Sequence, residues 1–363
     1  MKQAVILFLV GWFVCVSATQ GQTATGKSEP VRNIILMIGD GMGVAQVCAA
    51  ITVNHGQLNM AEFPVTGFSK TSSATDYITD SGAGATAIAI GEKTYNHAIG
   101  MDADTMAKPT ILEIASHHGK STGLVVTSQV THATPAAFVA HQPDRYMYEQ
   151  IASDFLNSDI DLFIGGGLDH FTKREDNNDL TAFLASDGYQ LVYKMKDLEK
   201  IKSGKVAGLL YDDKPPRYSK GRKDMLPEAT KKAIEILSQN KSGFFLLVEG
   251  SQIDWACHKN NDKYMIEETF DFDEAVKIAR QFAEKDGHTL VIVTADHETG
   301  GLTLPEGDLK SGDVKAKFSS LSHTGIMVPV FAFGPGSSQF TGVYENTELF
   351  FKMMKAFGFP LEQ

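Results

Sequence analysis

Cysteine is scarce in this sequence, and the scarcity excludes one class of fold. The chain has 363 residues and only three cysteines, one of which, Cys15, lies in an apolar N-terminal run. The two that remain, Cys48 and Cys257, are too few for a disulfide scaffold. The fold must therefore rest on its own hydrophobic core, and the sequence assigns no pairing between these two thiols.

Net positive charge and long apolar runs are also lacking. The 33 Lys and Arg residues face 44 Asp and Glu residues, which gives a formal net charge of −11. Such a chain gains nothing electrostatically from polyanions, so we expect no nucleic-acid partner. Beyond the N-terminus no apolar run reaches transmembrane length, so we expect no stable membrane anchor. An anionic substrate would need local positive charge, which metal ions commonly supply.

The first 30 residues are expected to lie outside the folded part of the chain. An apolar run over Ala4–Val16 follows Lys2 and leads into small residues typical of a cleavage site. Residues 1–18 are therefore interpreted as a secretory signal peptide, and an N-terminal membrane anchor is the alternative. Residues 19–30 are polar and predict a disordered lead-in. We expect a periplasmic or secreted protein whose residues 31–363 form a single domain.

Apolar segments alternate with amphipathic ones along the predicted domain. Several predicted strands are apolar throughout, which is typical of strands buried on both faces of a parallel sheet. Strands alternating with helices indicate the α/β class, as a doubly wound, mostly parallel sheet with helices on both faces. The basic segment Lys214–Lys223 is interpreted as a solvated surface loop rather than a binding patch. The predicted strands are Asn33–Ile38, Thr122–Thr127, Asp161–Ile164, Gly243–Val248, His288–Thr294 and Val328–Phe333. The predicted helices are Val44–Val53, Gly82–Ile90, Ile111–His118, Tyr146–Asn157, Leu180–Asp187, Pro227–Gln239, Asp262–Asp286 and Asn346–Phe357.

Carboxylate or imidazole side chains follow three of the predicted strands. Asp40 comes after the first strand, Glu249 after the fourth, and Asp296 with His297 after the fifth. Ligands of open α/β sheets bind outside the carboxyl ends of the strands, so we expect these side chains to converge. Clustered carboxylates repel one another and are tolerated where cations neutralise them. The pattern therefore predicts a metal centre.

Further candidate ligands lie later in the chain. Asp254 and His258 are four residues apart, so on a helix they would share one face and could hold one ion. His323 stands just before the last predicted strand. Oxygen and imidazole ligands without thiolate suit zinc at a catalytic site, whereas an all-oxygen site favours magnesium.

Ser81 and Arg145 are candidates for direct chemistry. Ser81 precedes a run of small residues, where a serine is ordinarily the N-cap of a helix. Alternatively, the amides and dipole of that helix N-terminus would stabilise an anion at Ser81. The planar guanidinium of Arg145 could bind two phosphate oxygens at once, although alone it would be an ordinary surface arginine.

In order and content, these motifs resemble those of the alkaline phosphatases. The resemblance covers nearly all of the chain from Asn33 to the final helix, and it implies the alkaline phosphatase fold. The motifs, in the family's order, are Ile38-Gly39-Asp40-Gly41-Met42-Gly43, Thr79-Asp80-Ser81, His132-Ala133-Thr134-Pro135-Ala136, Val248-Glu249-Gly250, Thr294-Ala295-Asp296-His297 and His323-Thr324-Gly325.

The resemblance implies an activity and a role for each matching residue. The activity is hydrolysis of small-molecule phosphate monoesters, with broad specificity and through a phosphoserine intermediate on Ser81. Arg145 is implied as the phosphate clamp, oriented by Asp80. Two zinc ions and one magnesium ion are implied as cofactors. Their implied ligands are Asp254, His258 and His323 for the first zinc, Asp40, Asp296 and His297 for the second, and Asp40, Thr134 and Glu249 for magnesium.

Two positions depart from the family pattern, and both are expected to line the substrate site. His132 stands beside the magnesium site where some members have Asp, and Trp255 follows Asp254 where others have Lys or His. An imidazole there would recruit a different ion or loosen magnesium, which leaves the identity of the third metal open. The stretch 300–321 is shorter than the insertion that helps form the dimer interface in larger members, so a homodimer is only one possibility.

Other functions predict different residues. A phosphodiesterase or related ester hydrolase of the same superfamily could use the two zinc ions but has less need of Arg145. A sulfatase would need Pro and Arg at fixed offsets after its nucleophile, and Ser81 lacks both. A dinucleotide-binding fingerprint would need a third glycine where Val44 stands. A metal-binding protein without catalysis would need neither Ser81 nor Arg145.

Overall fold

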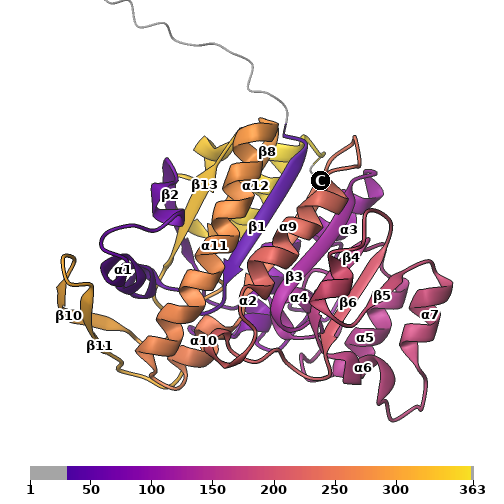
Figure 1. Cartoon of the computed structure of the whole chain (residues 1–363), viewed down its shortest axis with the longest axis horizontal. Coiled ribbons are helices and arrows are strands. Elements are labelled where there is room, and N and C mark those ends of the chain that lie inside the picture. The colour runs from indigo at the N-terminus through magenta and orange to yellow at the C-terminus, as the bar shows by residue number, and fades with distance from the viewer. Residues whose placement is uncertain (1–30, 361–363) are drawn as a thin grey trace, which may run out of the picture.

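One ten-stranded sheet runs through residues 31–360, the part of the chain that this computed structural model describes (Figure 1). Its strands lie in the order β14-β2-β13-β8-β1-β7-β3-β4-β6-β5. All neighbours pair in parallel except β13, which is antiparallel to both β8 and β2. The strands are β1 (Asn33–Gly39), β2 (Val65–Lys70), β3 (Ser121–Gln129), β4 (Leu162–Gly166), β5 (Gln190–Val192), β6 (Val206–Tyr211), β7 (Phe244–Gly250), β8 (Thr289–Thr294), β13 (Val328–Phe333) and β14 (Gly342–Glu345). Two small antiparallel pairs lie outside this sheet, namely β10 (Thr303–Asp308) with β11 (Asp313–Lys317) and β9 (Glu298–Thr299) with β12 (His323–Thr324).

Helices cover both faces of the sheet. Successive residues of the central strands point to opposite faces, so Ile34 and Leu36 join one hydrophobic cluster while Ile35 and Met37 join the other. In Figure 1, α9 and α11 cross the face of the sheet that is turned toward the viewer. The helices are α1 (Val44–Val53), α2 (Ser81–Ile90), α3 (Ile111–His117), α4 (Ala133–Ala136), α5 (Tyr148–Asn157), α6 (Leu168–Thr172), α7 (Leu180–Ser186), α8 (Met195–Leu198), α9 (Met225–Leu237), α10 (Gln252–Cys257), α11 (Asp262–Asp286) and α12 (Thr347–Phe357), with short 3-10 turns at Met60–Glu62, Tyr218–Lys220 and Ser337–Phe340.

The predicted α/β class, with its mostly parallel sheet between two helical layers, is confirmed. The predicted signal peptide (1–18) and lead-in (19–30) lie outside the described residues. None of the helices from residue 31 to residue 360 is long and apolar enough to cross a membrane. Within the same range Cys48 and Cys257 are free thiols, the first exposed and the second buried.

One interpretation of the sequence was wrong in part. The segment Lys214–Lys223, expected to be a solvated loop, contains Arg222, which is only 3 % exposed. Its guanidinium donates hydrogen bonds to Glu268 and to Asp271, the latter at 2.8 Å. Both acceptors lie on α11, so a buried ion-pair cluster ties this loop to the helical layer.

Candidate active site

The carboxyl ends of the central strands bring the predicted acidic residues together. In the sheet register, Ile38 of β1 lies beside Glu249 of β7 and beside Thr294 of β8. Asp40 follows β1 and Asp296 follows β8, so both come next to Glu249. All three carboxylates are fully buried. The predicted convergence of charged strand ends is therefore observed.

Ser81 lies at the N-terminus of α2, but it does not cap that helix. The N-cap is Asp80, whose Oδ1 accepts a hydrogen bond from the backbone N–H of Ala83 at 2.9 Å. The interpretation of Ser81 as an N-cap was therefore wrong, and its hydroxyl is left to face the site. Ser81 Oγ lies 3.2 Å from Nε2 of His297. The helix contains no large side chain before Ile88, which lets it pack closely; a Cβ on Gly84 would lie 3.0 Å from the backbone oxygen of Asp296.

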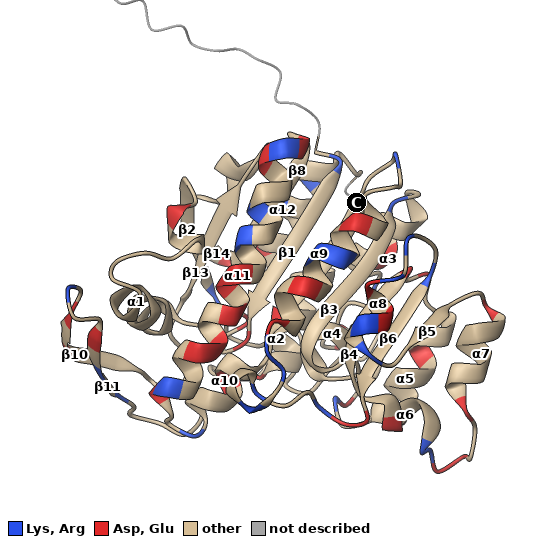
Figure 2. Cartoon of the chain, in the orientation of Figure 1, with Lys and Arg blue, Asp and Glu red and all other residues tan. Residues whose placement is uncertain are grey.

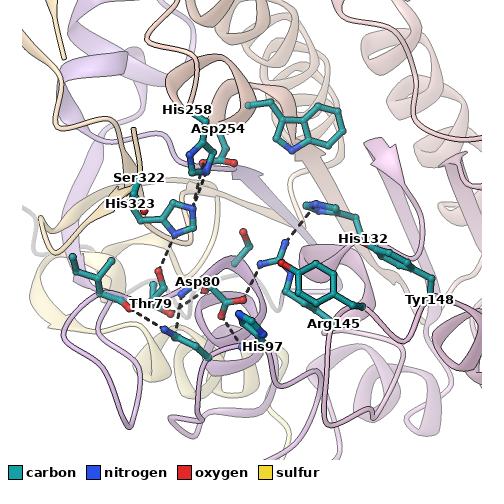
Figure 3. Close-up of a pocket in the computed structure, with 15 residues that line it drawn as sticks. Thr79, Asp80, His97, His132, Arg145, Tyr148, Asp254, His258, Ser322 and His323 are labelled. Atoms are coloured by element: carbon teal, nitrogen blue, oxygen red, sulfur yellow. Dashed lines mark hydrogen bonds and ion pairs between the residues drawn. The ribbon is translucent and has the colours of Figure 1, made fainter. Parts of the chain in front are cut away.

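Arg145 reaches the same point from the loop before α5. Its Nη1 donates to Asp80 Oδ2 at 2.8 Å, and its Nη2 lies 3.5 Å from Nε2 of His132 (Figure 3). Its backbone N–H donates to the oxygen of His97 at 2.8 Å. Burial alone would lower the pKa of Arg145, but the charge and hydrogen bond of Asp80 raise it. The guanidinium therefore stays charged beside Ser81.

The cluster contains three groups of potential ligands, each with its donor atoms within 4.8 Å of one another. The group of Asp40, Asp296 and His297 equals the predicted second zinc site. The other two groups are Asp254 with His297 and His323, and Asp40 with His132 and Glu249.

The first of these last two groups has His297 in place of the predicted ligand His258, and the second adds His132 to the predicted magnesium ligands Asp40 and Glu249. His258 still lies next to the predicted first zinc site, because its Nε2 is 3.3 Å from Asp254 Oδ1 and 3.2 Å from His323 Nε2. Figure 3 shows the His258 and His323 rings turned toward Asp254. Thr134, on α4, is fully buried, and the imidazole of His132 stands with the predicted magnesium ligands.

The charges of this cluster are unbalanced. Burial and the nearby carboxylates raise the pKa of Asp40. Burial raises the pKa of Glu249 to about 8, and burial with the charge of Asp254 raises that of Asp296 to about 7. Burial would also raise the pKa of Asp254, but the hydrogen bond from His258 holds it well below its ordinary value. Bound cations would relieve the repulsion that disfavours these ionised forms.

Unpartnered polar atoms are a second indication that this cluster binds cations. Buried oxygens and nitrogens normally have hydrogen-bond partners, and an exception calls for an explanation such as a catalytic role or a bound ion. Several buried atoms of the cluster make no hydrogen bond within residues 31–360. They are both carboxylate oxygens of Asp40, Nδ1 of His132, Oγ1 of Thr134, Oε1 of Glu249 and Oδ2 of Asp296. The donor set of oxygens and imidazole nitrogens fits zinc and magnesium.

An open cleft of about 490 Å³ lies above this cluster (Figure 3). Ser81, Arg145, Asp80 and the predicted substrate-binding residues His132 and Trp255 all line it. Several other residues that line the cleft were not predicted from the sequence, because none of them belongs to a motif that indicates a binding role. They are Ile78, Asn96, His97, Tyr146 and Tyr148. The only available signal was the adjacency of Tyr146 to Arg145.

Comparisons with known proteins agree with this geometry. The sequence matches the family alkaline phosphatase over residues 31–317. It is 35 % identical to alkaline phosphatase 4 of Bacillus subtilis, over 97 % of this chain and 95 % of the relative. It is 34 % identical to the alkaline phosphatase of Escherichia coli, over 92 % of this chain and 87 % of the relative. The structure of alkaline phosphatase from the Antarctic bacterium TAB5 is similar with a TM-score of 0.87 and 42 % identity, over 92 % of this chain and 100 % of that chain. The chain therefore belongs to the alkaline phosphatase family, and it is a hydrolase of phosphate monoesters.

Proposed function

We propose that this chain hydrolyses a broad range of small phosphate monoesters through a phosphoserine intermediate on Ser81, assisted by two zinc ions and a third cation. The observation that carries the proposal is the position of the Ser81 hydroxyl. It lies 3.2 Å from His297 Nε2, at the N-terminus of α2 and in the same cleft as the Arg145 guanidinium.

The residues that would hold the ions follow from the buried ligand groups. Asp254, His258 and His323 would hold the first zinc, and Asp40, Asp296 and His297 the second. When bound, these ions would lower the pKa of the serine hydroxyl and neutralise charge on the leaving oxygen. Asp40 belongs to two of the groups, so it would link the second and third sites.

The third cation has a mixed ligand set. The oxygens of Asp40, Thr134 and Glu249 favour magnesium, and we assign that ion to the site. His132 adds an imidazole nitrogen, which suits zinc better than magnesium. Two variants of the TAB5 enzyme, with one histidine replaced by Asp or by Glu, were solved with magnesium bound in the M3 site. We therefore expect zinc to compete with magnesium at the third site of this chain.

The chain's own groups account for the remaining steps. The Ser81 oxygen attacks phosphorus, the alcohol leaves, and the phosphoryl group becomes bonded to Ser81. Arg145 and the first amides of α2 bind the nonreacting phosphate oxygens, while Asp80 holds the plane of the guanidinium. A water molecule then attacks the phosphoserine, which releases inorganic phosphate and restores the hydroxyl.

Hydrolysis of an aryl phosphate at mildly alkaline pH tests the proposal. We expect loss of activity after chelation, recovery on metal addition, and near-complete loss in Ser81→Ala. Repletion with zinc alone and with zinc plus magnesium separates the contributions of the two ions. If the monoester is untouched while an aryl diester or sulfate ester is cleaved, the metal centre stands but the substrate class is wrong.

A further inference from the structure

Thr299 lies between the two proposed zinc sites and is not among their proposed ligands. The residue is fully buried and belongs to β9, two positions after His297. Its hydroxyl donates to Asp254 Oδ1 at 2.5 Å. The same Oγ1 lies 3.2 Å from Nδ1 of His297. One hydroxyl therefore contacts a proposed ligand of the first zinc and a proposed ligand of the second.

The proton count at this hydroxyl determines the direction of both bonds. A hydroxyl carries one hydrogen, and an ionised carboxylate can only accept. The hydroxyl hydrogen of Thr299 is therefore donated to Asp254. Oγ1 can then act only as an acceptor toward His297. Nδ1 of His297 must then carry its own hydrogen. The opposite nitrogen, Nε2, is left with a free electron pair.

That free nitrogen points at the proposed second zinc site. Nε2 of His297 lies 3.2 Å from Asp296 Oδ2 and 3.5 Å from Asp40 Oδ1. Metal-ligating histidines commonly donate the other ring N–H to an acceptor, which fixes the tautomer and the ring orientation.

We infer that Thr299 is a positioning residue for both zinc sites, through one hydroxyl that orients Asp254 in the first and selects the metal-binding tautomer of His297 in the second. This inference rests on the proposed two-zinc function. It predicts that loss of the hydroxyl weakens zinc binding at the two sites together.

The backbone of Thr299 is held independently of the hydroxyl, which makes the inference testable. Its N–H donates to Gly41 O at 3.2 Å, and its carbonyl oxygen accepts from Gln46 Nε2 at 2.8 Å. Thr299 also pairs with His323 between β9 and β12. Valine has nearly the same shape, so Thr299→Val should keep the fold while removing one oxygen.

The experiment measures zinc binding to the metal-free full-length chain by competition with a chromophoric chelator. Wild type, Ser81→Ala, Thr299→Ser and Thr299→Val are compared, with thermal unfolding of each metal-free protein as a check on folding. We expect Thr299→Val to bind both zinc ions about 10- to 100-fold more weakly. Thr299→Ser, which keeps the hydroxyl, should bind zinc about as tightly as wild type, and each metal-free protein should still show one cooperative unfolding transition.

The outcomes separate this inference from the proposed function. If wild type and Ser81→Ala bind fewer than two zinc ions, the two-zinc function is wrong. If they bind two but Thr299→Val binds zinc as tightly as wild type, only the role of Thr299 is wrong. An equal loss in Thr299→Ser and Thr299→Val would also overturn it, because the loss would then not depend on the hydroxyl. If metal-free Thr299→Val unfolds at a much lower temperature than wild type, the zinc affinity of Thr299→Ser tests the inference instead. Wild-type zinc affinity in Thr299→Ser supports the inference, and weakened zinc affinity contradicts it.

Discussion

The carboxylate of Asp80 has two structural roles, one at the start of α2 and one beside Arg145. One oxygen caps α2 and also accepts from the backbone N–H of His97 at 3.0 Å, while the other accepts from Arg145. Burial alone would raise the pKa of Asp80, but Arg145 and the backbone donors lower it. The side chain therefore stays ionised, and the start of the helix and the phosphate clamp are fixed relative to each other.

Arg145 gives the first prediction at this scale. Replacing it with alanine should lower kcat/KM for an aryl phosphate by about 10- to 100-fold, since charge-assisted hydrogen bonds contribute about 1.5–3 kcal/mol. Arg145→Lys should recover only part of the loss, because lysine keeps the charge without the planar fork. Inhibition by inorganic phosphate should weaken in parallel. Arg280→Lys is the control, because Arg280 pairs with Glu62 and Glu284 away from the cleft. Unchanged phosphate inhibition in Arg145→Ala would contradict the assignment.

At the scale of elements, His141 holds the start of α3. Its Nε2 lies 3.0 Å from Glu113 Oε1 and its Nδ1 lies 2.7 Å from Gly100 O. Glu113 also closes the capping box of α3 with Thr110. Burial alone would lower the pKa of His141, but the hydrogen bonds to Glu113 and Gly100 raise it. Both ring nitrogens face acceptors, so the charged imidazolium is the favoured form.

The sign of the pH dependence follows from that raised pKa. A histidine whose pKa is higher in the folded state stabilises the protein fully below its unfolded pKa of about 6.5, and it loses that effect as pH rises through the folded value. His141→Gln should therefore cost about 1 kcal/mol more at pH ~6 than at pH ~9. Urea unfolding of both proteins at each pH measures the difference. The pH effect should vanish when the same substitution is made in a Glu113→Gln background, and an equal cost at both values would contradict it.

The buried cluster of Arg222 with Glu268 and Asp271 predicts a large loss of stability. Arg222→Ala leaves two buried carboxylates without their cation, which should lower the free energy of unfolding by about 3–5 kcal/mol. Arg217→Ala is a matched control in the same loop, because that guanidinium lies over the Tyr264 ring at 5.0 Å and is half-buried. We expect it to cost less than about 1 kcal/mol. Urea unfolding that places Arg222→Ala within 1 kcal/mol of wild type would show that the cluster contributes little.

How much the sequence predicts differs between elements. The central strands were predicted because burial on both faces makes them apolar throughout. Once these strands were located, the charged residues at their carboxyl ends could be recognised as candidate ligands. The strands β2 and β14 were not predicted, because they lie at or near a sheet edge and carry exposed residues. The burial of Arg222 was not predicted for a different reason, because its partners lie 46 and 49 residues away on α11. Only the folded chain brings such groups together.

At the scale of the whole molecule, many acidic residues lie on the surface among basic residues, whereas others are buried in the candidate active site. Figure 2 shows acidic and basic residues interspersed along α9 and α11, so charges there are balanced locally. The buried carboxylates of Asp40, Glu249, Asp254 and Asp296 have no such balance within the described residues, apart from the nearby histidines and Arg145. Metal binding should therefore contribute to the stability of the entire fold.

Metal removal tests that expectation. Each ion that binds only the folded chain should stabilise it by about 3 kcal/mol when its free concentration is about 100 times its dissociation constant. Thermal unfolding should therefore occur at a lower temperature with chelator than with zinc and magnesium. Ser81→Ala keeps all proposed ligands and should show the same shift as wild type. A midpoint that chelation leaves unchanged would mean that the carboxylate cluster holds no structural cation.

The central claim is that phosphate passes through Ser81, and the most direct measurement is the site of covalent phosphorylation. The metal-loaded chain is mixed with an aryl phosphate, and the reaction is quenched rapidly in acid during turnover. The protein is then digested, and the masses of its peptides are measured by mass spectrometry. We predict one added phosphoryl group on the peptide that contains Ser81, and none anywhere in Ser81→Ala. A phosphoryl group on another side chain, or turnover at the full rate without any modified peptide, would contradict the account.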